Sequence, residues 1–506
     1  MAWIFQSGTS TCRKRMRSPN RLHSKGSTMP SHSTTTRRLS RRRFLQAGAL
    51  GAVAALPLAG YAKRLNPRRD WLTSGPNFLE GALKAVQWIR SAQMDTAQGR
   101  YWLSEPDHPG KKTSACELTG ICGGGAGIVL FFLQMAHATG EASYLDDARR
   151  GADYLTAVWP NLLGKSVEPS RANLSFYEGI AGIAFALSET SKAMKEPRYQ
   201  QAALAATDAV AQPMGTETGW TDPAHTADLV LYLLYAARTF HVETYRALAM
   251  EAGLRLVAMG KPHECGGMSW QNAGVTSAGQ PSLAAEDETA HVSFTLARLF
   301  EEVQDSTFLN TSLEGAAHVQ SVVTGSGALI SYTSASFLSA SHPEFGPAIT
   351  GRARLFYQLY KVTGTDCYRE QAEALANAAI RAEESVRHTP NSWETVRQSS
   401  GAASLLDLLL DLSAALGNLE YVEIAASLAS RIVEQNTDFD GKSYVWDQRF
   451  PWIVPSALSA QTGYLTGAAG IGAALVHVAL AQRGDLRPIV FPDSPFSDSC
   501  KQFTIS

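Results

Sequence analysis

Apolar residues recur along the chain at helical spacing, in segments that are separated by short polar turns. Between residues 77 and 93, Leu79, Leu83, Val86 and Ile89 share one face of a helix. Residues 128–136 and 144–159 show helical patterns of the same kind, whereas strand patterns are sparse and are best at 321–331 and 442–446. The pattern therefore predicts a chain built of paired helices.

A glycine-rich turn precedes three of the apolar helices. Its three copies are Gly124-Gly-Ala-Gly127-Ile128, Gly179-Ile-Ala-Gly182-Ile183 and Gly467-Ala-Ala-Gly470-Ile471. In the first two copies, a tyrosine follows the last glycine at the same distance, Tyr144 after Gly127 and Tyr199 after Gly182. Glycine at such turns lets two backbones approach closely or allows positive φ.

The distance from Gly127 to Tyr144 recurs further along the chain without the full glycine motif. It joins Asp228 to Tyr245, His291 to Phe308, Gly351 to Tyr368 and Ser404 to Tyr421. Between successive starting positions there is room for two helices, since a helix averages about 11 residues. Gly470 begins a seventh unit with a shortened tail. Such a repeat predicts an all-α fold, an α/α toroid of seven helical hairpins with inner and outer layers.

Residues 1–62 have the composition of an export signal. Residues 1–43 contain eleven Lys and Arg and no acidic residue, and an apolar run follows at 47–62. The paired arginines in Ser40-Arg-Arg-Arg-Phe-Leu45 resemble the twin-arginine type, which export machinery recognises on folded proteins. We expect a periplasmic or secreted protein, or a membrane-anchored one if the signal stays uncleaved. The sequence does not decide between Met1 and Met29 as the start.

The export signal divides the chain into a leader and a single domain. We expect the leader at 1–62 and the toroid domain at 63–506, with its repeats at about 77–480 and a C-terminal tail at 484–506. Without the leader, Lys plus Arg falls from 45 to 34 while 46 acidic residues remain, so the net charge is −12. That charge disfavours nucleic acid as a partner. Cys116 and Cys122 are close enough in sequence to form a disulfide in an oxidising compartment, but the sequence alone does not establish one.

The three glycine motifs, and the Thr-Gly-x-x-x-Tyr turns at 139–144 and 363–368, resemble the LanC-like family of lanthionine synthetase cyclases. The resemblance covers about residues 77–480. It implies an α/α toroid with seven inner helices. It also implies a zinc ion at the mouth of the ring, where active members add cysteine thiols to dehydrated Ser or Thr residues of a peptide.

The zinc ligands that the resemblance implies are missing from this sequence. The family's Cys-His-Gly falls on Ser399, Ser400 and Gly401, and its Trp-Cys falls on Phe345 and Gly346. Zinc sites of this type need thiolate and imidazole ligands, which serine and glycine cannot replace. We therefore predict no zinc and no other cofactor.

Polar residues replace glycine at the start of the third and fourth repeats, in His225-Thr-Ala-Asp228 and Glu286-Asp-Glu-Thr-Ala-His291. The resemblance implies an acid/base histidine in the fourth repeat, which falls on Asp287 by spacing and on His291 by local sequence. Helices of neighbouring repeats should begin close together. We therefore expect these side chains to gather at one side of the ring mouth, with the candidate catalytic residues being His225, Asp228, Asp287, Glu288 and His291.

Three interpretations of this cluster remain open. The acidic residues could cap helices, which typically contributes about 0.3–1 kcal/mol. A carboxylate could instead orient a histidine for acid/base catalysis. Alternatively, His225, Asp228 and His291 could bind a divalent metal ion.

Three classes of function also remain open. The first is a zinc-free LanC-like protein that binds or modifies a peptide in the ring. The second is a carbohydrate-active hydrolase, lyase or epimerase with a six-hairpin-glycosidase-like architecture, using Asp228 with one of the carboxylates at 286–288 at about 5–10 Å. Loop tryptophans such as Trp270 and Trp446 could contact sugars or peptides there, or simply pack together. The third is a binding scaffold without catalysis; the sequence gives neither the substrate, peptide or oligosaccharide, nor the oligomeric state.

Overall fold

The computed structural model describes residues 77–108, 113–164, 171–214, 222–263, 266–270, 283–325, 349–387, 396–398, 401–438, 440–446, 459–485 and 487–496. They belong to one compact unit, Leu65–Ser506. The expected leader at 1–62 lies outside the described residues, so it stays a prediction. Among the helices described, none has the length and apolar character needed to span a membrane.

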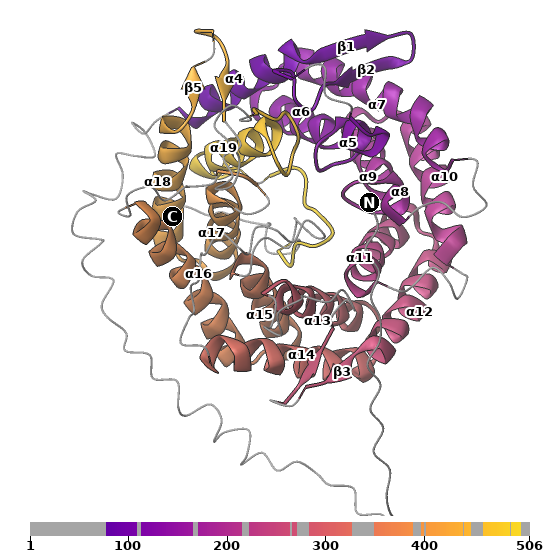
Figure 1. The fold of residues 1–506 in the computed structure, drawn as a ribbon, viewed down its shortest axis with the longest axis vertical. Coiled ribbons are helices and arrows are strands. Elements are labelled where there is room, and N and C mark those ends of the chain that lie inside the picture. Colours follow the sequence, from indigo (N-terminus) through magenta and orange to yellow (C-terminus); the bar gives the residue numbers. More distant parts are fainter. Residues whose placement is uncertain are drawn as a thin grey trace, which may run out of the picture. The chain divides into compact units, whose positions relative to one another are not determined.

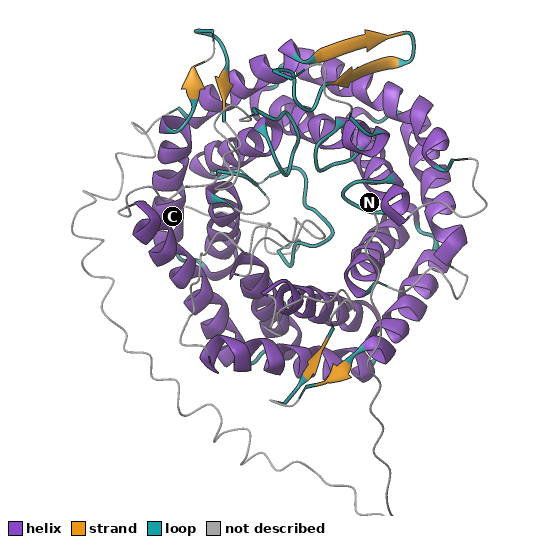
Figure 2. Cartoon of the chain, in the orientation of Figure 1, coloured by secondary structure: helices purple, strands orange, loops and turns teal. Residues whose placement is uncertain are grey.

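The described helices form a ring of two concentric layers (Figures 1 and 2). The inner layer consists of α6 (Gly125–Thr139), α9 (Ile180–Met194), α11 (Pro223–Phe240), α13 (Leu283–Val303), α15 (Ile349–Thr363), α17 (Ala402–Leu416) and α19 (Ala468–Gln482). The outer layer consists of α4 (Phe78–Ser91), α7 (Ala142–Leu162), α10 (Pro197–Met214), α12 (Glu243–Met259), α14 (Ser306–Gly325), α16 (Asp366–Arg387) and α18 (Glu420–Glu434). Short helices α5 (Ala115–Thr119) and α8 (Arg171–Leu174) precede α6 and α9. The predicted α/α toroid of seven helical hairpins is confirmed.

The two ends of the ring close on each other through α4 and α19. These helices pack together as inner and outer partners, and α19 also packs against α6. At Gly81 of α4, a β-carbon would lie only 2.9 Å from the Leu475 side chain of α19. Among the described residues no outer helix follows α19, as the predicted shortened tail requires, and the seventh unit is completed by α4 from the start of the ring.

A left-handed residue follows each of the first six inner helices and explains the constant distance to the next aromatic residue. The six residues have φ between 56° and 73° and are Gly140, Lys195, His241, Gln304, Gly364 and Gly417. Each precedes the aromatic residue of its unit by four positions. The backbone N–H of each donates to the carbonyl four positions earlier. The length of the inner helix and the turn to the outer helix are thus fixed together.

The glycine motif is required by the close approach of two backbone segments. A β-carbon at Gly182 would lie 1.9 Å from the carbonyl oxygen of Phe176, and one at Gly470 would lie 1.6 Å from that of Tyr464. Neither glycine has positive φ. Of the two sequence-based reasons for glycine here, the structure therefore supports the crowding of backbones.

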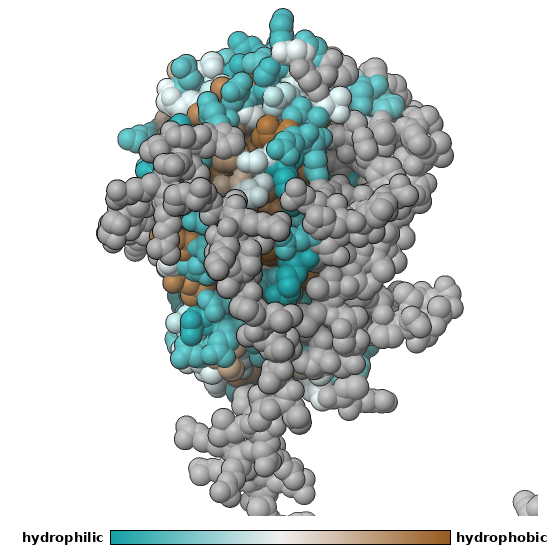
Figure 3. Space-filling view, turned by 90° about the vertical axis from the view of Figure 1, so that its left-hand side faces the viewer, coloured by the Kyte–Doolittle hydropathy of each residue, from teal (hydrophilic) through white to brown (hydrophobic). Residues whose placement is uncertain are grey.

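The inner helices are buried on all faces, whereas the outer helices are buried on one side. Residues 125–136 of α6 are all buried, as expected for a helix that is apolar on every face. In α4, by contrast, buried residues alternate with exposed ones. Figure 3 shows the described surface of one side as mostly hydrophilic, with hydrophobic residues in small separate areas. Most of the apolar surface therefore lies between the layers.

Three antiparallel hairpins each follow an outer helix. They pair β1 (Gln93–Thr96) with β2 (Gly99–Trp102), β3 (Lys261–Pro262) with β4 (Met268–Ser269), and β5 (Thr437–Asp438) with β6 (Tyr444–Val445). The strand predicted at 442–446 is present as β6. The one predicted at 321–331 is wrong for residues 321–325, which continue α14, while 326–331 lie outside the described residues.

Tryptophans at the ends of two hairpins pack into the ring wall. The Trp270 Nε1–H donates to the carbonyl oxygen of Leu256 at 2.7 Å, and the Trp446 Nε1–H donates to that of Ile432 at 2.8 Å. Both side chains are buried. These two tryptophans therefore serve packing, which is one of the two alternatives that the sequence left open for them.

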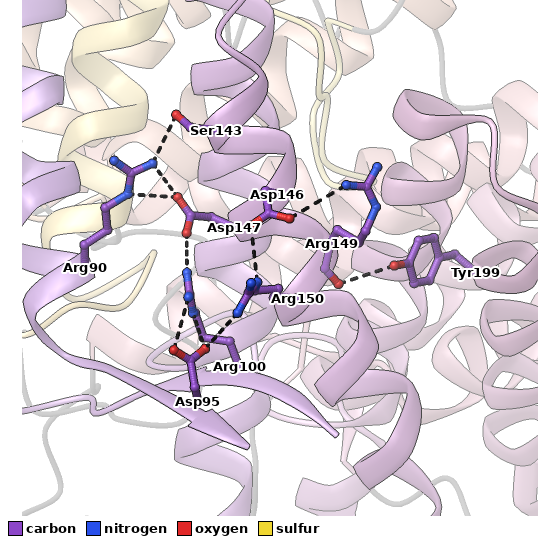
Figure 4. A network of polar contacts seen from close by, with 9 residues as sticks. All are labelled: Arg90, Asp95, Arg100, Ser143, Asp146, Asp147, Arg149, Arg150 and Tyr199. Atoms are coloured by element: carbon purple, nitrogen blue, oxygen red, sulfur yellow. Dashed lines mark hydrogen bonds and ion pairs between the residues drawn. The ribbon is translucent and has the colours of Figure 1, made fainter. Parts of the chain in front are cut away.

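A buried carboxylate holds the β1–β2 hairpin to the outer layer (Figure 4). Asp147 Oδ2 of α7 accepts a hydrogen bond from Arg90 Nη2 of α4 at 2.6 Å, and Asp147 Oδ1 accepts one from Arg100 Nη1 of β2 at 2.5 Å. Asp147 is 4% exposed and Arg100 is 8% exposed. One carboxylate thus links two neighbouring outer helices and the hairpin between them.

We expect Asp147→Ala to lower the free energy of unfolding by about 3–5 kcal/mol, because it removes the buried carboxylate that two arginines share and leaves Arg100 with the exposed Asp95. The matched control is Asp146→Ala on the same helix, whose exposed ion pairs contribute about 0–1 kcal/mol. Urea denaturation of both variants measures the difference. Equal losses in the two variants would contradict this role of Asp147.

Candidate functional site

Two of the five candidate residues form a buried pair between neighbouring inner helices. Asp228 of α11 and His291 of α13 are joined by a hydrogen bond of 2.8 Å between Oδ1 and Nε2. Asp228 is 6% exposed and His291 is 2% exposed. A carboxylate can only accept, so Nε2 carries the hydrogen of this bond. The carboxylate therefore orients the imidazole, as acid/base chemistry requires.

The other candidates lie elsewhere on the same two helices. His225 is in the first turn of α11, where its backbone N–H donates to Asp222 Oδ1 at 3.2 Å. Glu288 lies within α13, and Asp287 belongs to the same helix although its side chain lies outside the described part. The structure thus brings Asp228 and His291 together. The prediction for Asp287 is not tested.

The capping interpretation is wrong for Asp228 and Glu288. The residue that caps α11 is Asp222, which accepts from the N–H groups of Ala224 and His225. Asp228 lies six positions after this cap, while Gly182 lies three positions after the cap of α9. Because α11 begins about one turn earlier than the repeat spacing implies, its polar residue falls inside the helix. Glu288 lies similarly far inside α13.

The metal interpretation gains no support from the described residues. No group of three or more His, Cys, Asp or Glu side chains is placed to hold a metal ion within the described ranges. The expected positions of the family's zinc ligands, Gly346, Ser399 and Ser400, lie outside those ranges. The side chain of Cys116 does too, so the disulfide with Cys122 stays open.

A second Asp–His pair, which the sequence analysis missed, links α17 and α19. Asp407 Oδ1 lies 2.7 Å from His477 Nδ1, and Gln398 Nε2 donates to Asp407 Oδ2. Asp411 lies one turn further along α17 and is 2% exposed. The available signal was the run Leu405-Leu-Asp-Leu-Leu-Leu-Asp-Leu412, in which two carboxylates with spacing i, i+4 interrupt an apolar helix.

The two carboxylates of α17 differ in their affinity for a proton. Burial alone would raise the pKa of Asp407, but the hydrogen bond with His477 and the charge of Arg487 hold that pKa below its usual range. Burial raises the pKa of Asp411 above its usual range, although Arg487 opposes the shift. Neighbouring groups whose pKa values are pushed apart are typical of acid/base sites.

The C-terminal segment, residues 487–496, crosses the centre of the ring (Figure 1, yellow). Phe491 lies against Phe185 of α9 and Tyr464 before α19, with ring centroids 5.4 and 5.3 Å apart. On the opposite side of the ring, Phe496 stacks on Tyr357 of α15 at 4.5 Å. The segment therefore contacts inner helices on several sides of the ring at once.

The fold is an α/α toroid in which buried polar pairs join neighbouring inner helices. Residues 117–258 match the family model of the Lanthionine synthetase C-like protein. The solved structure of nisin cyclase is similar with 13% identity and a TM-score of 0.51, covering 77% of this chain and 94% of that chain. The predicted resemblance to the LanC-like family is thus confirmed over residues 117–258, and the similarity to nisin cyclase is one of fold.

Two carbohydrate-active proteins show a more distant likeness in fold. A GH76 α-mannanase from Bacteroides thetaiotaomicron has 10% identity and a TM-score of 0.43, covering 82% of this chain and 98% of that chain. A polysaccharide lyase has 12% identity and a TM-score of 0.40, covering 80% and 96%. A comparison with curated proteins gives no match. These likenesses are too remote to bear on function.

We expect Asp228 and His291 to be energetically coupled. In a double-mutant cycle of Asp228→Ala, His291→Ala and the double variant, the coupling in the free energy of unfolding should be about 1–3 kcal/mol, because either single change leaves a buried polar group without this bond. Urea denaturation provides the four values. A coupling near zero would show that the pair contributes nothing beyond its separate side chains.

We also expect Asp411→Asn to change the pH dependence of stability. Since the folded-state pKa of Asp411 is raised, the folded protein keeps a proton that the unfolded chain releases near pH 3.9, and wild-type stability falls as pH rises above that value. Asparagine does not titrate, so the difference in stability between variant and wild type should shift in favour of the variant as pH rises from about 4 to 7, whatever the fixed cost of losing the contact with Arg487.

The matched variant for this pH experiment is Asp407→Asn. Because the folded-state pKa of Asp407 is lowered, its carboxylate stabilises the wild-type protein above the pKa of an unfolded aspartate, and this stability is lost as pH falls. Relative to wild type, Asp407→Asn should therefore become less stable as pH rises toward that pKa. Thermal unfolding in buffers of constant ionic strength measures both trends. Parallel pH curves for wild type and both variants would contradict the opposite shifts.

Proposed function

We propose that this LanC-like protein binds a peptide at the centre of its ring and acts on it without zinc. The observation that carries the proposal is the C-terminal segment, residues 487–496, because the ring already holds a stretch of polypeptide there. Ile489, Ser494 and Phe496 of this segment are buried. The Lys361 ammonium of α15 also donates to the carbonyl oxygen of Pro495 at 2.9 Å. The inner helices thus offer both apolar and backbone-directed contacts to a peptide.

The pair of Asp228 and His291 is our candidate for acid/base chemistry on such a peptide. A carboxylate that fixes the imidazole through Nε2 leaves Nδ1 as the nitrogen whose proton can change. General acid/base catalysis contributes typically 10²–10⁴-fold to a rate. In this proposal the His291 imidazole transfers the proton, and Asp228 holds that imidazole in position.

The proposal excludes zinc because the residues at the family's ligand positions are poor zinc ligands. Gly346 has no side-chain donor, and Ser399 and Ser400 offer neutral hydroxyls, whereas zinc of this type takes thiolate and imidazole. Elemental mass spectrometry of protein purified without added metal should therefore find no stoichiometric zinc. One equivalent of bound zinc would refute this part of the proposal.

The carbohydrate alternative has less support in the described residues. It required Asp228 to act with one of the carboxylates at 286–288 about 5–10 Å away, whereas Asp228 is hydrogen-bonded to His291 of the same helix as those carboxylates. The side chains at 286 and 287 lie outside the described part. Export by the twin-arginine route remains our proposal for localisation, and fractionation of cells that express the full chain would check it.

The experiment that tests the function offers the full chain both ligand classes. A pool of random decapeptides and a panel of mannan and other oligosaccharides are incubated with the protein, and retained molecules are identified by mass spectrometry. We expect peptides to be retained, and His291→Ala to retain them too while abolishing any change in their mass. Retention of oligosaccharides but not of peptides would refute the proposal.

A further inference from the structure

The C-terminal segment places one arginine on two buried carboxylates of α17. Arg487 Nη2 lies 2.6 Å from Asp411 Oδ2, and Arg487 Nη1 lies 3.7 Å from Asp407 Oδ2. The side chains of Arg487, Asp407 and Asp411 are 10%, 5% and 2% exposed. Ion pairs so shielded from solvent depend strongly on both partners, because removal of one leaves a buried charge.

The same segment places an aromatic side chain four positions after the arginine. Phe491 lies among Phe176, Phe185 and Tyr464, with ring centroids between 5.3 and 6.4 Å away. Beyond it, Asp493 Oδ2 accepts from the Tyr177 hydroxyl at 3.0 Å and lies 3.7 Å from Arg354 Nη1. The ring centre thus contains a carboxylate subsite for a cation and an aromatic subsite beside it.

The two subsites belong to the ring and do not depend on how the segment is attached. Asp407 and Asp411 are on α17, Phe185 is on α9 and Tyr464 precedes α19, and these elements are held by their outer helices and neighbours. The segment itself has no helix or strand and joins α19 by a short connection after Arg483. A separate peptide with the same side chains would find the same partners.

We propose that the ring centre recognises peptides with an arginine or lysine followed four positions later by an aromatic residue, and that residues 487–496 occupy this site as an exchangeable intramolecular ligand. This rests on the proposed peptide function and specifies its ligand. A short tether gives the segment an effective concentration on the order of millimolar. Peptides therefore bind the wild-type chain, but more weakly than they bind a chain whose own segment is weakened.

The test uses the full chain and a labelled decapeptide with the sequence of residues 487–496. We expect the variant Arg487→Gln/Phe491→Ala, which weakens the segment's own contacts, to bind this decapeptide at least about tenfold more tightly than wild type does. The matched control is Arg483→Gln, which removes a hydrogen bond to the carbonyl oxygen of Ala138 outside the ring centre and should bind as wild type does. Fluorescence anisotropy gives the dissociation constants.

Selectivity is tested with a second decapeptide in which glutamine replaces the arginine. It should bind the double variant about tenfold more weakly than the first decapeptide, and adding Asp411→Asn to the double variant should remove this preference. Equal binding of the two decapeptides would overturn the inference and leave the peptide function standing. If the double variant is folded by circular dichroism and binds no peptide, from this pair or from the random pool, both proposals fail.

Displacement is tested in the wild-type chain without any substitution. Excess decapeptide should speed amide hydrogen exchange within residues 487–496, measured by mass spectrometry, because the displaced segment loses its contacts with the ring. Unchanged exchange at a decapeptide concentration that saturates the double variant would show that the segment does not exchange.

Discussion

The contact between α4 and α19 is the constraint on which the ring depends. An inner helix that is apolar on all sides must be covered by an outer helix, and α19 is followed by no outer helix of its own among the described residues. α4, from the other end of the repeat, covers it, and α18 packs against it as well. The carboxylate of Asp147 then joins α4 to the next outer helix, α7. Closure therefore fixes the relative positions of all inner helices and of the groups that they present.

The inner helices are largely apolar, and the closed ring brings ionisable side chains on them into pairs. Asp228 and His291 pair across one helix–helix boundary, and Asp407 and His477 pair across another. Because each pair draws its members from two neighbouring repeats, its geometry exists only when those repeats pack side by side. Burial then amplifies electrostatic differences, as the opposite shifts of the pKa values of Asp407 and Asp411 show.

Much of the fold could be predicted because each repeat is determined by interactions between residues that are close in sequence. The helix patterns, the close-packed glycines such as Gly182, and the fixed distance to the next aromatic residue all act within one hairpin. The role of α4 could not be predicted, since it depends on contact between opposite ends of the ring. The site was predicted in part: polar residues at 228 and 291 stood out where glycine was expected. Asp407 and Asp411 were hidden inside an apolar helix, and their importance appears only beside Arg487 from the C-terminal segment.

The position of residues 487–496 also links the docking of this segment to protonation of the ring centre. Arg487 belongs to this segment, so Asp407 and Asp411 lack its guanidinium whenever the segment is not docked. Two close carboxylates away from water favour keeping a proton between them. Docking of the segment brings in the guanidinium and weakens the hold on that proton. The docking equilibrium of this segment is therefore expected to depend on pH through these two carboxylates.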